Sequence, residues 1–129
     1  YAPTILEAAG IEIPEDIHGV SLLPLLKGDE WNSGRKGLYY HYYEFPDEHS
    51  VRPHFGVRTE RYKLIRICDV AEDADRKLEG SWELFDLETD PMELNNIYGQ
   101  DGYEELTDSL RKILLELQVK YGEEQYSNM

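Results

Sequence analysis

The chain has 129 residues, a formal net charge of −14 at pH 7 and a sequence pI of about 4.5, and 40% of its residues are hydrophobic. This size predicts one modest domain, and the composition is that of an ordered protein. Nucleic acid and anionic membranes are disfavoured as general partners, because a strongly negative protein repels both at long range.

The features that the sequence lacks narrow the possibilities further. Cys68 is the single cysteine, so an internal disulfide is excluded. No apolar run reaches the length of about 20 residues that a membrane span needs, and no signal-peptide pattern is present. The chain begins at Tyr1 without an initiator methionine. We therefore expect it to be part of a longer protein.

The N-terminal segment predicts a short helix followed by irregular structure. Residues 2–9 suit a helix, with Pro3 tolerated in the first turn and Gly10 placed to end it in the left-handed conformation. Prolines and glycines interrupt residues 11–29, so no long regular element is expected there. The segment needs a surface for its apolar side chains, which are Ile11, Ile13, Leu22, Leu23, Leu25 and Leu26.

Four segments rich in β-favouring residues follow, and each predicts a strand. They are residues 36–43, 54–59, 61–67 and 81–87. In the first, alternation predicts one face with Leu38, Tyr40 and Tyr42 and another with Tyr39, His41 and Tyr43. The second and third are separated only around Glu60 and Arg61, which indicates an antiparallel hairpin.

A long amphipathic helix is predicted near the C-terminus. Apolar residues recur at helical spacing over 103–121, and Asp101 or Gly102 can cap the start. Residues 68–80 are polar and predict a solvated connection, and Asp90-Pro91 breaks the chain after the last strand. The expected fold is α+β: a small four-stranded antiparallel sheet packed by one long C-terminal helix, preceded by an irregular N-terminal segment.

The positive charge is concentrated in one stretch. Residues 52–66 hold five lysines and arginines against one acid, a balance of +4, whereas residues 69–93 hold ten acids against two bases, a balance of −8. Alternation predicts that one face of the hairpin carries some of Arg52, His54, Arg58, Lys63 and Arg66. Such a face suits an anion with several oxygen atoms. The alternative is that these cations balance the acidic residues 69–79.

Neither a metal site nor a nucleophile is indicated by the residues. The histidines His41, His49 and His54 do not form the close pairs typical of zinc sites, and an aromatic strand more often holds a structural histidine. Cys68 is followed by acids that raise a thiol pKa, and no base accompanies it, which predicts an inert thiol.

Three stretches resemble the C-terminal portion of type I sulfatases, the formylglycine-dependent arylsulfatases of the alkaline phosphatase superfamily. They are "APTILEAAGIEIPEDIHGVSLLPLL", "YYHYYEFPDEHSVRPHFGVRTERYKLI" and "WELFDLETDPMELNNIYG", in that order. The resemblance implies that residues 1–30 are the tail end of a large catalytic domain. Residues 31–129 would form the C-terminal subdomain, a four-stranded antiparallel sheet packed by a helix.

The resemblance also implies which chemistry this chain lacks. In such sulfatases, calcium, the formylglycine made in a Cys/Ser-x-Pro-x-Arg motif, and the catalytic Lys and His belong to the N-terminal domain. No such motif occurs here, because Cys68 is followed by Asp69 and Val70. We expect no catalytic, cofactor-binding or metal-binding residue in this chain, which alone would be inactive although its parent is a sulfatase. The resemblance implies a periplasmic or extracellular location.

The role expected for the chain is to complete the substrate cleft and to recognise a sulfated substrate, a glycan or an aryl sulfate. His54 is the first candidate for a substrate contact, followed by His49 and Arg52 in the preceding loop. Arg58 is expected to pair with acids near the strand ends. The partner is the N-terminal catalytic domain of the same chain, and without it the exposed leucines of residues 22–26 are expected to drive self-association.

Two other functions remain open at this point. The chain could be a stand-alone module that binds an anionic carbohydrate, or the C-terminal part of a phosphate or phosphonate ester hydrolase of the same superfamily. An upstream Cys/Ser-x-Pro-x-Arg motif would indicate the sulfatase. An upstream Thr or Ser nucleophile with zinc ligands would indicate the phosphatase.

Overall fold

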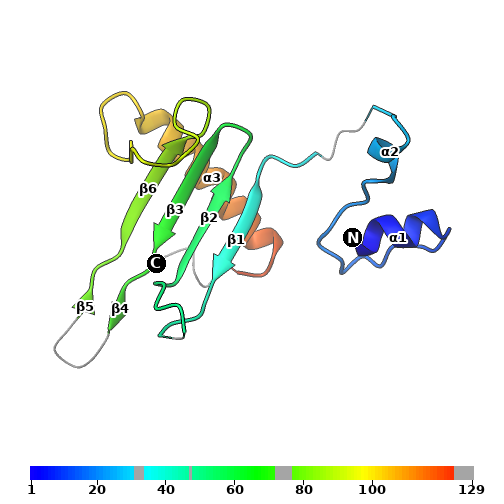
Figure 1. The fold of residues 1–129 in the computed structure, drawn as a ribbon, viewed down its shortest axis with the longest axis horizontal. Coiled ribbons are helices and arrows are strands. Elements are labelled where there is room, and N and C mark those ends of the chain that lie inside the picture. The colour runs from blue at the N-terminus through cyan, green and yellow to red at the C-terminus, as the bar shows by residue number, and fades with distance from the viewer. Residues whose placement is uncertain (31–33, 47, 72–76, 124–129) are drawn as a thin grey trace. The chain divides into compact units, whose positions relative to one another are not determined.

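The computed structural model describes residues 1–30, 34–46, 48–71 and 77–123. The chain divides into two units, Tyr1–Arg35 and Lys36–Met129, which are described separately below (Figure 1). In the described part of the chain, no helix combines the length and the apolar character needed to cross a membrane.

The first unit holds a short helix and a single helical turn. Helix α1 spans Ala2–Ala8 and has Pro3 in its first turn, and Gly10 follows with a φ of 70°, which confirms the predicted start and end. Helix α2 spans only Leu23–Leu26. The threonine hydroxyl of Thr4 accepts a hydrogen bond from the Leu22 backbone N–H at 3.0 Å. The residues between the two helices are irregular, as predicted.

The second unit contains the predicted antiparallel sheet. Its strands are β1 (Leu38–Tyr42), β2 (His54–Arg58), β3 (Tyr62–Ile67) and β6 (Ser81–Asp86), in the order β1-β2-β3-β6 with antiparallel pairing throughout. Between β3 and β6, the short strands β4 (Val70–Ala71) and β5 (Lys77–Leu78) pair with each other. The prediction of a solvated polar connection over 68–80 did not include this pairing.

The turn of the β2–β3 hairpin is closed by a threonine. The Thr59 N–H donates to the Tyr62 carbonyl at 2.8 Å, and the Thr59 hydroxyl accepts from the Tyr62 N–H at 2.9 Å. A short polar side chain that bonds to nearby backbone favours a tight turn. The hairpin therefore forms where it was predicted, although the sequence has no Asn-Gly signal.

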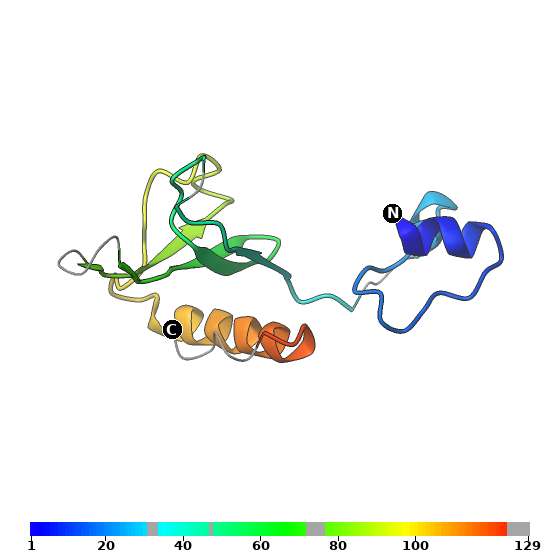
Figure 2. The same ribbon diagram turned by 90° about the horizontal axis from the view of Figure 1, so that it is seen from below.

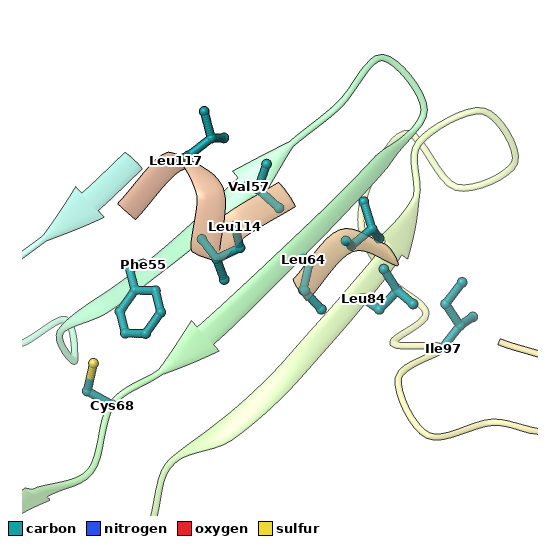
Figure 3. Packing of buried hydrophobic residues seen from close by; sticks show 9 residues of the cluster. Phe55, Val57, Leu64, Cys68, Leu84, Ile97, Leu114 and Leu117 are labelled. Carbon is teal, nitrogen blue, oxygen red and sulfur yellow. The ribbon is translucent and has the colours of Figure 1, made fainter. Parts of the chain in front are cut away.

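Helix α3 (Glu104–Lys120) lies across one face of the sheet, as predicted (Figure 2). Val57, Leu64 and Leu84, from three neighbouring strands, are fully buried, and Figure 3 shows them with Leu114 and Leu117 of the helix. The predicted cap is wrong, because Tyr103 occupies the N-cap position and makes no side-chain capping bond. Acidic residues in the first turn complement the helix dipole instead.

The outer edge of β6 is covered by the chain that follows it. The Ile97 N–H donates to the Leu84 carbonyl at 2.9 Å, and the Leu84 N–H donates to the Asn96 side-chain oxygen at 3.0 Å. The Asn96 amide also donates to the Trp82 carbonyl at 3.2 Å. This return brings Ile97 into the hydrophobic core.

An arginine fork joins the β2–β3 turn to the end of β6. Arg61 Nε and Nη2 donate to Asp86 Oδ1 and Oδ2 at 3.0 and 2.7 Å, and Arg61 Nη1 lies 2.9 Å from Glu88 Oε2. The sequence predicted this role for Arg58. Arg58 is exposed, and it forms no ion pair with any described residue. The residue in the turn, rather than the one in the strand, reaches the acid.

The Arg61–Asp86 pair should make stability depend on pH. The Arg61 guanidinium holds the pKa of the Asp86 carboxyl below its usual value, against the opposing effect of burial. A depressed folded-state pKa gives stability that is complete above the unfolded pKa of about 4 and is lost as pH falls through the folded pKa. We expect Asp86→Asn to be less stable than wild type at neutral pH, with the gap closing on acidification. Urea denaturation at several pH values measures this, and a gap independent of pH would contradict it.

Candidate functional site

The candidate site lies on the sheet face opposite α3. Strand register places His54 beside Tyr42 and places Tyr40 beside Gly56, all on this face, whereas Tyr39 pairs with Val57 on the helix face. The alternation predicted for the tyrosine-rich strand is therefore confirmed. The segments that follow β1 and β6 rise from the sheet on the side away from α3 (Figure 2).

His54 is held between two tyrosines and a backbone carbonyl. Its ring is stacked on Tyr42 at a centroid distance of 5.5 Å and an interplanar angle of 22°, and it meets Tyr40 edge-on at 6.0 Å and 69°. Its Nδ1 lies 2.9 Å from the carbonyl oxygen of Arg52. No described residue forms a hydrogen bond with Nε2. One ring nitrogen is thus used by the fold, and the other retains its hydrogen-bonding capacity with respect to the described residues.

Tyr40 packs over a glycine, and this close approach shapes the face. A Cβ on Gly56 would lie 2.7 Å from the Tyr40 hydroxyl oxygen and closer still to the Leu64 carbonyl oxygen. Burial raises the pKa of Tyr40, and the charges of Glu93 and Glu83 raise it further. The hydroxyl is buried and has no hydrogen-bond partner among the described residues. Tyr40 is thus an uncharged aromatic side chain packed beside His54.

Arg52 is bonded to the backbone of two separate segments, one just after β3 and one just before β6. Its Nη2 donates to the carbonyl oxygens of Cys68 and Glu79, both at 2.7 Å. The next residue is also pinned, because the Cys68 N–H donates to the Pro53 carbonyl at 2.8 Å. His49, the remaining candidate, is exposed in the loop between β1 and β2. Three residues were predicted to contact the substrate. Two of them, Arg52 and His54, are joined in the structure, because the Arg52 carbonyl oxygen lies 2.9 Å from His54 Nδ1.

Most cations of the hairpin are neutralised within the chain. Lys63 pairs with Glu93 at 2.5 Å, on the same face as His54. Arg66 instead lies on the helix face opposite Phe55, with its guanidinium 5.8 Å from the Trp82 ring and 3.6 Å from Asp69. Of the residues from which one basic face was predicted, His54, Arg58 and Lys63 share a face and Arg66 does not. Among the described residues, the hairpin cations pair with acids of 86–93 as well as with Asp69 of the predicted range 69–79.

His41 belongs to a separate cluster on the other face. Its Nδ1 lies 2.7 Å from Glu123 Oε2, and Tyr43 donates to the second oxygen of Glu123 at 2.5 Å. Burial raises the pKa of Glu123, but hydrogen bonds from Tyr43 and His41 outweigh it and lower the pKa. Because His41 and His54 lie on opposite faces of the sheet, they cannot bind one ion.

Cys68 is buried behind the Arg52 contact. Its side chain is within the hydrophobic core, and burial raises the pKa of the thiol. A buried thiol with a raised pKa is a poor nucleophile. The backbone of Cys68 contributes to the site instead, because its N–H donates to the Pro53 carbonyl and its carbonyl accepts from the Arg52 guanidinium.

Comparison with known proteins gives consistent matches. Residues 1–120 match the family described as N-sulphoglucosamine sulphohydrolase, C-terminal. The chain is 43% identical over 126 residues to an N-acetylglucosamine-6-O-sulfatase of Bacteroides thetaiotaomicron, and the match covers 94% of this chain and 21% of the relative. It is 35% identical to an arylsulfatase of Clostridium perfringens, and this match covers 98% of the chain and 23% of the relative.

The fold is also shared with a solved structure. The protein BT4656, solved in complex with its substrate D-glucosamine-2-N,6-O-disulfate, superposes with a TM-score of 0.81 at 42% identity. The match covers 94% of this chain and 23% of that one. The chain therefore spans between a fifth and a quarter of the length of these relatives.

Proposed function

Because the chain belongs to the N-sulphoglucosamine sulphohydrolase C-terminal family, the C-terminal subdomain of sulfatases, we propose that it completes the substrate site of a sulfatase. We propose further that the substrate is a glycan containing 6-O-sulfated glucosamine. The observation that carries this proposal is His54, whose Nδ1 is bonded to the Arg52 carbonyl and whose ring stacks on Tyr42, while Nε2 forms no hydrogen bond with a described residue.

The substrate class is supported by the relatives' names. The Bacteroides thetaiotaomicron relative is named an N-acetylglucosamine-6-O-sulfatase, and BT4656 was solved with D-glucosamine-2-N,6-O-disulfate. Both are about two-fifths identical to this chain over nearly its whole length. Because both names specify a glucosamine sulfated at O6, this sugar is the substrate class that we propose.

The cleavage step is assigned to a part of the protein outside this chain. Sulfate ester hydrolysis needs an activated nucleophile and stabilisation of developing charge. Cys68 is buried, and no group of three or more His, Cys, Asp or Glu side chains in the described segments could hold a metal ion. The described residues therefore offer neither a cluster of ligands for calcium nor an accessible cysteine for a formylglycine. We propose that an N-terminal catalytic domain carries both. Periplasmic or extracellular location and self-association remain predictions.

A stand-alone module for anionic carbohydrates is less well supported. Such a module needs cations that are free to meet sulfate or carboxylate groups. Arg61, Lys63 and Arg66 pair with acids of the chain, and Arg52 donates to backbone carbonyls. Of the hairpin's basic residues, this leaves Arg58 exposed and without an ion pair to a described residue. An interaction with the uncharged part of a sugar fits the face better.

His54→Ala in the full-length protein tests the proposal. We expect kcat/KM for a 6-O-sulfated N-acetylglucosamine substrate to fall by about tenfold, the loss expected for one hydrogen bond, while a small aryl sulfate is hydrolysed nearly as before. Arg58→Ala is the control, because Arg58 is exposed on the same strand. Equal losses on both substrates would count against a recognition role for this face.

A further inference from the structure

We propose that Arg52 is a positioning residue that fixes His54 in the tautomer protonated at Nδ1, so that Nε2 accepts a hydrogen bond from a hydroxyl group of the sugar. This inference rests on the proposed function and specifies what His54 recognises. It assigns His54 to the uncharged part of the substrate rather than to the sulfate group.

The first step is that the peptide carrying the Arg52 carbonyl is immobilised. The Arg52 guanidinium donates to Cys68 and Glu79 at 2.7 Å, which anchors the residue to the end of β3 and to the segment before β6. On the other side, the Cys68 N–H bonds to the Pro53 carbonyl at 2.8 Å. The chain at residues 52 and 53 is thus tied to the neighbouring strand by both side chain and backbone. The Arg52 carbonyl keeps a constant position toward His54.

The second step concerns the proton on the ring. A carbonyl oxygen only accepts hydrogen bonds, so the His54 Nδ1 at 2.9 Å from the Arg52 oxygen must donate. In a neutral imidazole, a proton on Nδ1 leaves Nε2 with a lone pair and no hydrogen. Nε2 then accepts from a hydroxyl or N–H group and repels the oxygen atoms of a sulfate group. The carbonyl contact therefore decides which kind of ligand atom Nε2 can meet.

The third step concerns the neighbours of the ring. His41 has a carboxylate partner, because Glu123 lies 2.7 Å from its Nδ1. His54 has no carboxylate oxygen within 4 Å among the described residues, and its neighbours are the rings of Tyr40 and Tyr42. Among these neighbours, the Arg52 carbonyl is the group that the His54 ring bonds to.

Nitrogen-15 NMR of the histidine rings in this chain tests the tautomer without any substrate. We expect His54 to show a protonated Nδ1 and an unprotonated Nε2 at neutral pH. Arg52→Met should bring the second tautomer into exchange, because the side chain keeps its length but loses the donors to Cys68 and Glu79. Arg58→Met, the same substitution at an exposed position of β2, should leave the His54 signals unchanged.

Paired substitutions of His54 in the full-length protein provide a second measurement. The amide of glutamine lies near the position of Nε2, whereas that of asparagine lies near Nδ1. We expect His54→Gln to keep most of the kcat/KM for the 6-O-sulfated N-acetylglucosamine substrate, and His54→Asn to lose about three- to tenfold. With the wild-type protein, removing the contacted hydroxyl from the substrate should lower kcat/KM by the same factor. With His54→Asn, removing this hydroxyl should lower kcat/KM no further.

The outcomes separate this inference from the proposed function. A His54 ring protonated at Nε2, or a tautomer unchanged by Arg52→Met, would overturn the positioning role while leaving a sulfatase function intact. If Arg52→Met fails to fold, the inference is still tested by the tautomer of His54 in the wild-type protein and by the kcat/KM of His54→Gln and His54→Asn. If His54 is protonated at Nδ1 but His54→Ala keeps full activity, this face does not recognise the substrate. That outcome would overturn the inference as well.

Discussion

Replacing Leu64 with alanine is expected to lower the free energy of unfolding by about 2 to 5 kcal/mol. Leu64 is in the central strand β3, it is completely buried, and it lies between Val57 and Leu84 in the sheet register. Its side chain faces α3, so truncation removes apolar contacts with both layers and leaves a cavity that the rigid sheet cannot easily close. Urea denaturation followed by circular dichroism measures the loss.

Leu115→Ala is the matched control for this prediction. Leu115 is on α3 but is about half exposed, so the same truncation should change the free energy of unfolding by less than about 0.5 kcal/mol. If the two substitutions had similar effects, the packing of α3 on the sheet would have to differ from that described here.

Gly56→Ala is expected to cost about 3 kcal/mol and also to displace the tyrosine beside His54. The new methyl group would overlap the Leu64 carbonyl oxygen, which belongs to the backbone of β3 and cannot move without disturbing the ladder. It would also press on the Tyr40 hydroxyl, which is 2.7 Å away. The effect should therefore appear both in urea denaturation and in the His54 ring signals.

The control for Gly56→Ala is Arg58→Ala, two residues along the same strand. Arg58 is exposed and already carries a Cβ, so its truncation should leave both measurements nearly unchanged. Unaltered His54 signals in a folded Gly56→Ala protein would show that Tyr40 does not support the site.

The sheet and the helix could be predicted because their signals are local and periodic. Alternation in the tyrosine-rich strand and helical spacing after residue 103 both describe one face of one element, and both were confirmed. The β4–β5 pairing and the return of Asn96 and Ile97 along β6 had no such signal. They depend on contacts between segments that the sequence pattern treats as loops.

The site was harder to predict because it depends on which partner each polar side chain finds. His54 was singled out from the sequence, and in the structure its Nδ1 is bonded to the Arg52 carbonyl while Nε2 forms no hydrogen bond with a described residue. From the sequence, Arg58 was expected to pair with an acid near the strand ends, but Arg61 forms this pair. The charge of a residue does not show whether its side chain reaches an acid. The link from Arg52 through its own carbonyl to His54 involves backbone atoms, which no residue pattern encodes.

The side-chain amide of Asn96 has a consequence for assembly. By bonding to both Trp82 and Leu84, it occupies hydrogen-bonding positions that an edge strand would otherwise offer to another chain. Together with the Ile97 N–H bond to the Leu84 carbonyl, these bonds oppose the addition of another strand at this edge of the sheet. An alanine at position 96 would remove both side-chain bonds and leave only the Ile97 bond of the three.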